Sequence, residues 1–195
     1  LTTKTPDGVA TIFPLKALPK RKKYPNFILA LDHLQDPGNL GNLFRTALAA
    51  DIEELWLALG ADPLSQKVLR ASSGAVLHLP YERSGNAYEE AVEELIKKLE
   101  LASSKGHQVL ATNVPKNELS ASCLPYWEVD WLQPTVLVLG NEGSGLNSSI
   151  KACCTHSITL PHSQSVESLN VASAAVPLLL ERRRVRMISE MQNLR

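Results

Sequence analysis

The segment from Ile158 to Ala175 concentrates small hydroxyl and amide side chains between two apolar elements. Residues 158–160 are typical of a short strand, Pro161 and the polar residues after it indicate a loop, and a helix is expected to begin near Ser168. A strand–loop–helix junction leaves backbone N–H and C=O groups free to bind a ligand. An ordinary strand-to-helix connection with a serine cap is the alternative. His162 has the chemistry of a general base, although a solvent-exposed loop histidine is the simpler interpretation.

A second candidate segment, residues 39–45 (NLGNLFR), opens an expected helix shortly after an apolar strand. In an open α/β sheet, ligands bind at the edge where the strands end. We predict that Asn39 caps this helix and that Gly41 keeps the backbone approachable. Arg45 follows Gly41 by four residues, on the same helix face, and its planar guanidinium suits a phosphate or carboxylate. A surface arginine in a salt bridge is the alternative interpretation.

Residues 136–146 (VLVLGNEGSGL) form a third segment, in which a strand leads into a loop with three glycines and then a helix. The glycines lack the G-x-G-x-x-G spacing of a dinucleotide site, which disfavours a nucleotide-dependent oxidoreductase. The Glu142 carboxylate would repel a phosphate, so the loop suits a cationic or hydroxyl-bearing ligand better. The alternative is a glycine-rich turn whose glutamate caps a helix.

Apolar runs separated by helical patterns must position these three segments. We expect strands over residues 27–31, 55–59, 75–80, 109–112, 135–139 and 158–160. Helices are expected after residue 36, from Asp62 and Pro63, over residues 87–103, and from near Ser168 to the C-terminus with a kink at Pro177. This alternation predicts an α/β fold with a mostly parallel six-stranded sheet and helices on both faces. Residues 121–134 resist assignment, and their two tryptophans, Trp127 and Trp131, are expected to pack over the sheet.

The composition of the 195-residue chain indicates one domain with an N-terminal arm. Because the formal net charge is +0, nucleic-acid binding would need local basic patches. The candidates are Arg21, Lys22 and Lys23 in the arm and Arg182, Arg183, Arg184 and Arg186 near the C-terminus, with a solvated face as the alternative.

The three cysteines, Cys123, Cys153 and Cys154, include no C-x-x-C pair. We therefore expect neither a metal site nor disulfide bonds, and a reducing compartment. The sequence has no apolar run long enough to span a membrane and no recognisable signal peptide.

Taken together, N-x-G-x-x-x-R, L-V-L-G-x-E-x-x-G-L and L-P-x-x-x-x-V-E-S-L-N-V, in this order, resemble the three signature motifs of the SpoU family. That family is a branch of the SPOUT class of RNA methyltransferases, and the resemblance covers about residues 24–184. The dipeptide Asp36-Pro37 and the run KVLRASSGA (residues 67–75) resemble the members that methylate the 2′-hydroxyl of guanosine in ribosomal RNA. A transfer-RNA ribose methyltransferase and a non-catalytic RNA-binding relative are the alternatives.

The resemblance implies a sheet whose C-terminal part is threaded into a deep trefoil knot, with S-adenosylmethionine bound by the knot loops. The cofactor-binding residues that it implies are Thr112, Asn113, Leu139, Gly140, Asn141, Glu142, Gly143, Leu160, Pro161, Ser168 and Leu169. The catalytic positions that it implies are Asn39, Arg45, Glu142, Ser168 and Asn170, with Arg45 also contacting RNA. It further implies a homodimer in which the partner's first motif completes the active site.

In this family an RNA-binding domain often precedes the methyltransferase domain, and TPDGVA (residues 5–10) resembles the stretch that joins them. We therefore expect residues 1–23 to be a linker and residues 24–195 the methyltransferase domain. The expected location is the cytoplasm of a bacterium, or otherwise a plastid or mitochondrion.

Two positions depart from the family pattern. His162 stands where methionine is common, and Gln164 stands where glycine is common. Backbone angles that glycine adopts freely would cost glutamine about 1 kcal/mol or more, which bears on the geometry of the cofactor loop.

Overall fold

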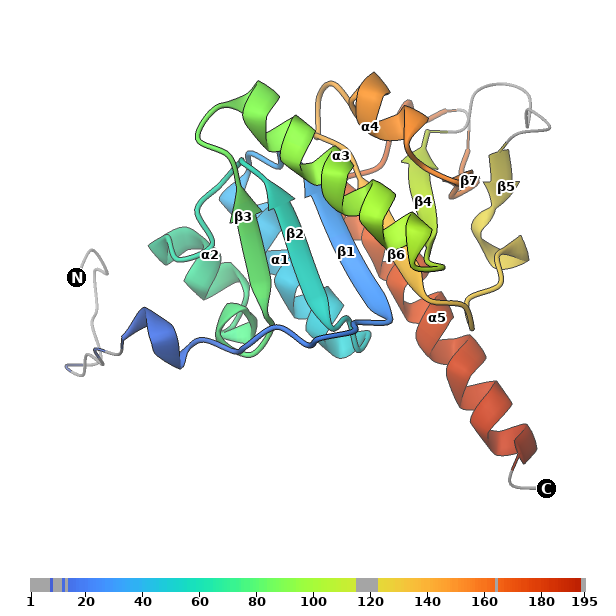
Figure 1. Ribbon diagram of the computed structural model, residues 1–195, viewed down its shortest axis with the longest axis horizontal. Coiled ribbons are helices and arrows are strands. Elements are labelled where there is room, and N and C mark those ends of the chain that lie inside the picture. The colour runs from blue at the N-terminus through green and yellow to red at the C-terminus, as the bar shows by residue number, and fades with distance from the viewer. Residues whose placement is uncertain (1–7, 9–11, 13, 115–122, 164, 194–195) are drawn as a thin grey trace.

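The structure, a computed structural model, describes residues 8, 12, 14–114, 123–163 and 165–193. Its sheet has seven parallel strands in the order β3-β2-β1-β6-β4-β7-β5 (Figure 1). The strands are β1 Phe27–Asp32, β2 Glu54–Ala58, β3 Tyr81–Ser84, β4 Gln108–Asn113, β5 Cys123–Pro125, β6 Thr135–Leu139 and β7 His156–Thr159. The helices are α1 Pro37–Ala49, α2 Gln66–Ala71, α3 Tyr88–Ser104, α4 Ser148–Ala152 and α5 Val171–Asn193. Short 3-10 turns lie at Leu15–Ala17, Ala75–Leu77 and Tyr126–Glu128.

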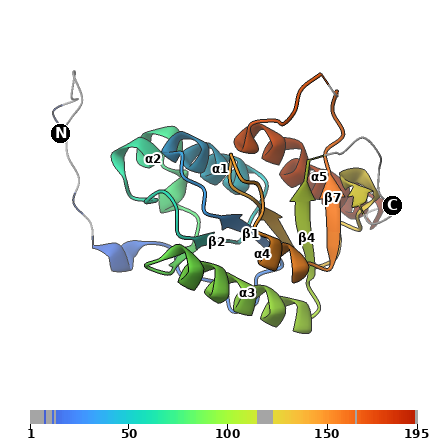
Figure 2. The ribbon, with the colours of Figure 1, turned by 90° about the horizontal axis from the view of Figure 1, so that it is seen from above.

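The strands β1, β2 and β6 are buried along their whole length, which explains their continuous apolar sequences. Because side chains alternate along a strand, Phe27, Leu29 and Leu31 of β1 face a hydrophobic cluster that includes α1 and α5. Ile28 and Ala30 face the opposite cluster, which includes α3 and α4. Figure 2 shows the resulting three layers, with α1, α2 and α5 on one side of the sheet and α3 and α4 on the other. The predicted parallel α/β architecture is confirmed.

The predicted number and placement of strands are partly wrong. The sheet has seven strands rather than six. The apolar run at residues 75–80 forms a 3-10 turn that buries Ala75 and Val76 beside α1, and the strand begins only at Tyr81. A short apolar run fits either conformation, so its hydrophobicity alone does not decide between them. The additional strand, β5, is three residues long and lies at the edge of the sheet, within the stretch that resisted assignment.

The two tryptophans of that stretch differ in burial. Trp131 is buried, its ring centroid lies 6.3 Å from that of Phe27, and its Nε1 donates to the Tyr126 carbonyl at 2.8 Å. Trp127 leaves 54% of its surface exposed. Packing over the sheet is therefore confirmed for Trp131 and wrong for Trp127. Residues 121 and 122 lie outside the described residues.

The first two helices begin at caps other than the predicted ones. Asp36 caps α1, and its Oδ1 accepts the backbone N–H of Asn39 at 2.7 Å. Asn39 therefore lies in the first turn, and its prediction as the cap is wrong. Ser65 caps α2, whereas Asp62 belongs to the turn before it. Pro63 lies in that turn and not in the first turn of α2. The prediction of a helix that starts at Asp62 and Pro63 is therefore wrong.

The remaining helices follow the sequence pattern more closely. Helix α3 confirms the amphipathic helix predicted over residues 87–103. Helix α5 begins at Val171 rather than near Ser168, because the Asn170 side chain caps it by accepting two backbone N–H groups. Pro177 lies inside α5, and the expected kink stays a prediction. Helix α4 confirms the helix that was expected after the glycine-rich loop, although its five residues are too few for a hydrophobic period to give its bounds.

The order of the strands reverses between β1 and β6. Strands β2 and β3 extend the sheet on one side of this pair, and β4, β7 and β5 extend it on the other. Such a switch point opens a crevice at the carboxyl ends of the strands. The loop after β1 and the loop after β6 meet at this crevice, and the three candidate segments all lie at this edge. The expected trefoil knot stays a prediction.

Candidate active site

A cavity of about 610 Å³ lies at the carboxyl edge of the sheet. Its wall is formed by the ends of β4, β6 and β7, by the loop after β6, by the loop before α5 and by the first turns of α5. Continuous stretches of the wall are residues 112–114, 139–146 and 167–171, and Asn39 of α1 adds a side chain. A cavity of this volume is large enough for a ligand of nucleoside size.

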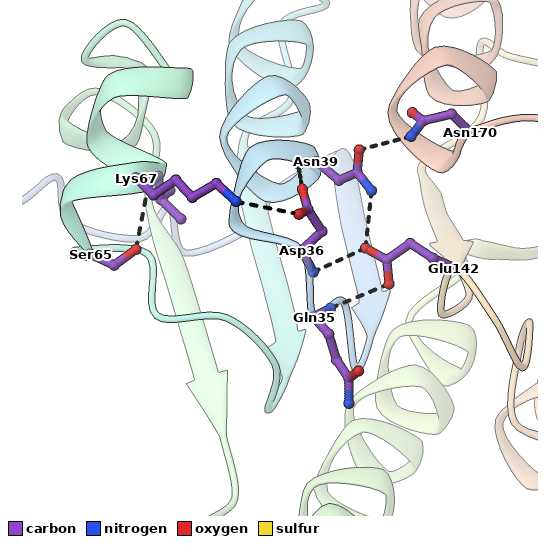
Figure 3. A network of polar contacts seen from close by, with 8 residues as sticks. Gln35, Asp36, Asn39, Ser65, Lys67, Glu142 and Asn170 are labelled. Atoms are coloured by element: carbon purple, nitrogen blue, oxygen red, sulfur yellow. Dashed lines mark hydrogen bonds and ion pairs between the residues drawn. The ribbon is translucent and has the colours of Figure 1, made fainter.

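Side chains from three distant segments meet directly at the rim of the cavity. The Asn170 Nδ2 donates to Asn39 Oδ1 at 2.9 Å, and the Asn39 Nδ2 donates to Glu142 Oε1 at 3.2 Å (Figure 3). The Glu142 carboxylate also accepts the backbone N–H groups of Gln35 at 3.3 Å and Asp36 at 3.2 Å. Glu142 therefore ties the glycine-rich loop to the loop that precedes α1. The structure thus brings together three residues that were predicted from separate motifs.

The polar network continues from α1 to α2 (Figure 3). The Asp36 Oδ2 lies 3.7 Å from Lys67 Nζ, and the Ser65 hydroxyl accepts the backbone N–H of Val68 at 3.4 Å. The N–H bond from Asn39 lowers the pKa of Asp36, more than desolvation raises it, and Lys67 lowers it further. The Asp36 carboxylate therefore stays negatively charged at the start of α1, where the positive end of the helix dipole stabilises a negative charge.

The glycine-rich loop folds back on itself between β6 and α4. The backbone N–H of Asn141 donates to the Gly145 carbonyl at 2.9 Å, and the Gly145 N–H donates to the Asn141 carbonyl at 3.1 Å. The Asn141 Oδ1 accepts the backbone N–H of Gly143 at 2.8 Å. A Cβ on Gly140 would lie 2.3 Å from the backbone nitrogen of Leu146, so the closed loop requires glycine at this position. The loop in this form lines the cavity with residues 140–146.

All but one of the predicted cofactor-binding residues lie on the cavity wall. Those on the wall are Thr112, Asn113, Leu139, Gly140, Asn141, Glu142, Gly143, Leu160, Ser168 and Leu169. Pro161 is exposed and is not part of the wall. His162 does line it, half-buried, with its Nδ1 2.9 Å from the Leu160 carbonyl oxygen, so its interpretation as an exposed loop histidine is wrong. Gln164 lies outside the described residues.

Arg45 lies away from the cavity of its own chain. It is exposed on α1, is not part of the cavity wall, and makes no hydrogen bond or ion pair with a described residue. It follows Asn39 by six residues, about 1.7 helical turns, so the two side chains point in different directions.

Gly41, one turn before Arg45 on α1, is buried. A Cβ on Gly41 would lie 2.5 Å from the Ala71 Cβ and 2.9 Å from the backbone nitrogen of Ser72. The prediction that Gly41 leaves the backbone open to a ligand is therefore wrong, because α2 occupies that space. The glycine is required for the close packing of α1 against α2.

The basic residues of the arm lie under the amino ends of the strands, on the edge opposite the cavity (Figure 1). The Arg21 Nε lies 2.5 Å from an oxygen of the buried Glu54, and the Lys22 Nζ lies 2.9 Å from Glu53. Lys23 has no carboxylate partner within the described part of the chain and lies over the ring of its neighbour Tyr24. RNA binding by the arm stays a prediction. Of its three predicted residues, Lys23 is the one without an ion pair in the described part of the chain.

Arg182 is part of the core, so its prediction as an RNA-binding residue is wrong. Its Nη1 donates to the carbonyl oxygens of Trp131 at 2.8 Å and Gln133 at 2.6 Å, and its guanidinium lies 4.5 Å from the ring centroid of Phe27. Burial lowers the pKa of Arg182 to about 10. The other three arginines of this cluster, Arg183, Arg184 and Arg186, pair with Asp51, Glu181 and Glu190 on the surface.

Comparison with known proteins identifies the family. The model of the SpoU rRNA Methylase family matches residues 26–179. The chain belongs to this family. An uncharacterized tRNA/rRNA methyltransferase of Synechocystis is 38% identical over 185 residues, which cover 94% of this chain and 62% of that protein. A 23S rRNA guanosine 2′-O-methyltransferase of Bacillus subtilis is 32% identical over 91% of this chain and 65% of its own length.

A solved structure has the same fold as this SpoU chain. The AdoMet-bound rRNA methyltransferase from Sinorhizobium meliloti superimposes with a TM-score of 0.69 at 32% identity, over 81% of this chain and 56% of that one. The resemblance inferred from the three motifs is therefore confirmed. The chain spans about six-tenths of the length of these relatives.

Among the described residues, no group of three or more His, Cys, Asp or Glu side chains could hold a metal ion. Within the same ranges, no helix combines the length and apolar character that crossing a membrane requires.

Proposed function

We propose that this protein transfers a methyl group from S-adenosylmethionine to a ribose 2′-hydroxyl of RNA. The observation that carries the proposal is the convergence of the three motif segments on one cavity, where Asn170, Asn39 and Glu142 form a continuous hydrogen-bonded series. The relatives support it, because one is an AdoMet-bound rRNA methyltransferase and another is named for ribose 2′-O-methylation.

The cavity suits this cofactor in size and chemistry. Its volume of about 610 Å³ lies within the range of small-molecule sites. Leu139, Leu160 and Leu169 on the wall provide apolar contacts for an adenine ring, and the backbone of residues 140–146 provides N–H and C=O groups for its polar edge. Thr112 and Asn113 add polar side chains. S-adenosylmethionine supplies a methyl group that is electrophilic because it is bound to a sulfonium sulfur.

The residues of the chain must orient the ribose hydroxyl and provide for its proton. Methyl transfer breaks a carbon–sulfur bond and forms a carbon–oxygen bond, and the thioether leaves as a neutral group that needs no acid. The hydroxyl proton must pass to a base. Arg45 is not that base, because a guanidinium stays protonated. We assign Arg45 to a bidentate clamp on the adjacent RNA phosphate, with a phosphate oxygen or a neighbouring side chain accepting the proton.

The other motif residues hold the site in shape. Asn39 and Glu142 join the loop before α1 to the glycine-rich loop, and Ser168 and Asn170 hold the loop before α5 and the substrate ribose. Because Arg45 lies outside the cavity of its own chain, we propose a homodimer in which Arg45 of one subunit serves the cavity of the other. Recognition of the 2′-hydroxyl would make the site specific for RNA over DNA.

Ribosomal RNA is the proposed substrate, with guanosine as the modified nucleoside, and the name of the Bacillus subtilis relative supports this choice. Transfer RNA is the alternative, since the Synechocystis relative is named for both. A non-catalytic RNA-binding role is the second candidate function, and the departures from the family at His162 and Gln164 favour it. We also propose residues 1–23 as a linker and 24–195 as the methyltransferase domain, with activity in a bacterial cytoplasm, plastid or mitochondrion. The start of the family match at residue 26 supports this boundary.

Transfer of tritiated methyl from S-adenosylmethionine onto ribosomal and transfer RNA fragments tests the activity. A fragment with a 2′-deoxy nucleotide at the mapped position should accept no label. Calorimetry with S-adenosylmethionine separates the enzyme from the non-catalytic alternative, because only the enzyme needs to bind the cofactor.

Arg45→Ala tests the assigned clamp. We expect turnover to fall by at least about a hundredfold, since a charge-assisted bidentate contact to the substrate is lost, while cofactor affinity changes less than about twofold. Arg45→Lys is the matched control, because it keeps the charge and loses the planar fork, and it should restore only part of the rate. Loss of cofactor binding in either variant would contradict the assignment.

A further inference from the structure

Asp32, the last residue of β1, is a buried carboxylate beside the proposed active site. It is 1% exposed, its Oδ2 accepts the backbone N–H of Asn147 at 2.8 Å, and its Oδ1 accepts the Tyr88 hydroxyl at 3.1 Å. The Tyr88 oxygen in turn accepts Asn147 Nδ2 at 3.3 Å. Desolvation raises the pKa of Asp32, against the lowering effects of Asn147, Tyr88 and His33. Within the described ranges, no lysine or arginine forms an ion pair with it.

Glu54 shows how the same fold treats another buried carboxylate. It is also 1% exposed, but it lies at the amino edge of the sheet, where Arg21 pairs with it and the Trp56 Nε1 donates to it at 2.6 Å. Asp32 has hydrogen-bond donors but no such cation. A buried carboxylate without a cation is costly, and an apolar residue would serve packing better. The presence of a buried carboxyl group here therefore indicates a role at the carboxyl edge.

The contacts of Asp32 and its neighbour indicate that role. Asn147 is the residue at which the glycine-rich loop ends and α4 begins. His33, which directly follows Asp32, accepts the Asn141 Nδ2 on its carbonyl oxygen at 2.7 Å, near the start of the same loop. Asp32, at the end of β1, and His33, directly after it, therefore hold the two ends of one loop.

The backbone at this point is itself in an uncommon conformation. His33 has φ 50°, a left-handed value that residues other than glycine rarely adopt, and its ring lies 4.7 Å from that of Tyr88. Backbone strain of this kind persists only where the surrounding contacts fix it. The conformation turns the His33 carbonyl to Asn141 while the preceding carboxylate faces Asn147.

We propose that Asp32 is a positioning residue that sets the curvature of loop 140–146 and thereby shapes the cofactor-binding wall. The inference rests on the proposed function, because residues 140–146 are the wall that would contact the cofactor. A loop that is held at both ends loses little freedom on binding, whereas a loosened loop must be ordered at the expense of affinity.

Asp32→Asn tests the proposal with a side chain of the same shape. The amide keeps one acceptor oxygen and replaces the other with a donor, so either Asn147 or Tyr88 loses its present partner. We expect the dissociation constant for S-adenosylmethionine to rise about tenfold, which corresponds to about 1.4 kcal/mol. In the ligand-free protein, amide hydrogen exchange across residues 141–147 should become faster. Glu54→Gln is the matched control, and it should leave both quantities unchanged even if it lowers the urea midpoint as much.

Tyr88→Phe provides a milder variant if Asp32→Asn does not fold. It removes one donor to Asp32, keeps the ring against His33, and should change both measurements in the same direction by a smaller factor. Unchanged loop exchange in whichever variant folds, or equal effects of Glu54→Gln, would overturn the proposal. If the unmodified protein did not bind S-adenosylmethionine, the proposed function would fail, while the exchange measurement would still decide the role of Asp32.

Discussion

At the scale of single residues, Glu142 is a hydrogen-bond acceptor that joins two loops. Its two oxygens accept the backbone N–H groups of Gln35 and Asp36 and the side-chain amide of Asn39. All three donors come from the start of α1 or the loop before it, where the helix dipole favours a negative charge. The sequence suggested a carboxylate that awaits a cationic or hydroxyl-bearing ligand. The structure instead shows a carboxylate already occupied by the protein itself.

Glu142→Gln should destabilise the protein and weaken the site together. A glutamine has one acceptor oxygen, and its NH₂ group would face a backbone N–H or the donating amide of Asn39. If the Asn39 amide turned to accommodate it, the bond from Asn170 would be lost. We expect the free energy of unfolding in urea to fall by about 1 kcal/mol and methyl transfer to slow.

The control for this substitution is Glu167→Gln. Glu167 also lies on the cavity wall, but within the described part of the chain its carboxylate accepts no hydrogen bond. It should therefore keep the stability of the unmodified protein. Equal stability of both variants would show that the contacts of Glu142 do not hold the two loops together.

At the scale of elements, strands that are buried along their whole length can be predicted from the sequence. Elements whose conformation depends on contacts with neighbouring elements cannot. Strands β1 and β6 are apolar at nearly every position because both faces are covered, and they were predicted within one residue at either end. Strand β3 has the sequence YERS, which carries little apolar signal because it lies at the edge of the sheet. The strand was predicted instead at the preceding apolar run, residues 75–80, which begins with a 3-10 turn.

The start of α1 shows why caps are harder to predict than helices. Asp36, Pro37 and Asn39 all favour a helix start, and the sequence does not say which of the two capping residues accepts the first free N–H. In the structure Asp36 does so, and Asn39 is free to bind Glu142 and Asn170. Asp36 is thus the cap, and Asn39, which was predicted both as the cap and as a site residue, lies at the rim of the cavity.

Asp36→Ala should lower the free energy of unfolding by about 1 kcal/mol at neutral pH, because the N–H of Asn39 loses its acceptor. Asp36→Asn is the control and should lose only the small part that depends on the charge, since asparagine caps helices about as well and the exposed pair with Lys67 at 3.7 Å contributes little. If Asp36→Asn destabilised as much as Asp36→Ala, the cap would not be the source of the effect.

The capping contribution of the charge should also depend on pH. The pKa of Asp36 is lower in the folded protein than in the unfolded chain, so the charged form is favoured by folding. The resulting stability is present above the ordinary carboxyl pKa of about 4 and is lost as the pH falls through the folded value. The difference between the urea midpoints of the unmodified protein and Asp36→Asn should therefore shrink as the pH falls below about 4.

At the scale of the whole molecule, the two edges of the sheet have separate tasks. The carboxyl edge holds the cavity and the converging helix starts, while the amino edge holds the arm through the ion pairs of Arg21 and Lys22. The motif residues of the site could be predicted because the family resemblance places them. The role of Asp32 could not, because Asp32 and Asn147 are 115 residues apart and meet only through the pairing of β1 with β6.

The arm offers a test of the proposed RNA binding at the scale of the whole molecule. Because Arg21 and Lys22 are neutralised by glutamates, we expect Lys23 to provide the phosphate contact of the arm. Lys23→Ala should then reduce the slope of log K for RNA against log salt concentration by about 0.7 to 0.9, the value for one phosphate contact. Arg21→Ala should instead lower the urea midpoint, because it leaves the buried Glu54 without its cation, and should leave the salt slope unchanged. Lys105→Ala, at the exposed end of α3, controls for the loss of one positive charge. An unchanged slope for Lys23→Ala would mean that Lys23 makes no phosphate contact.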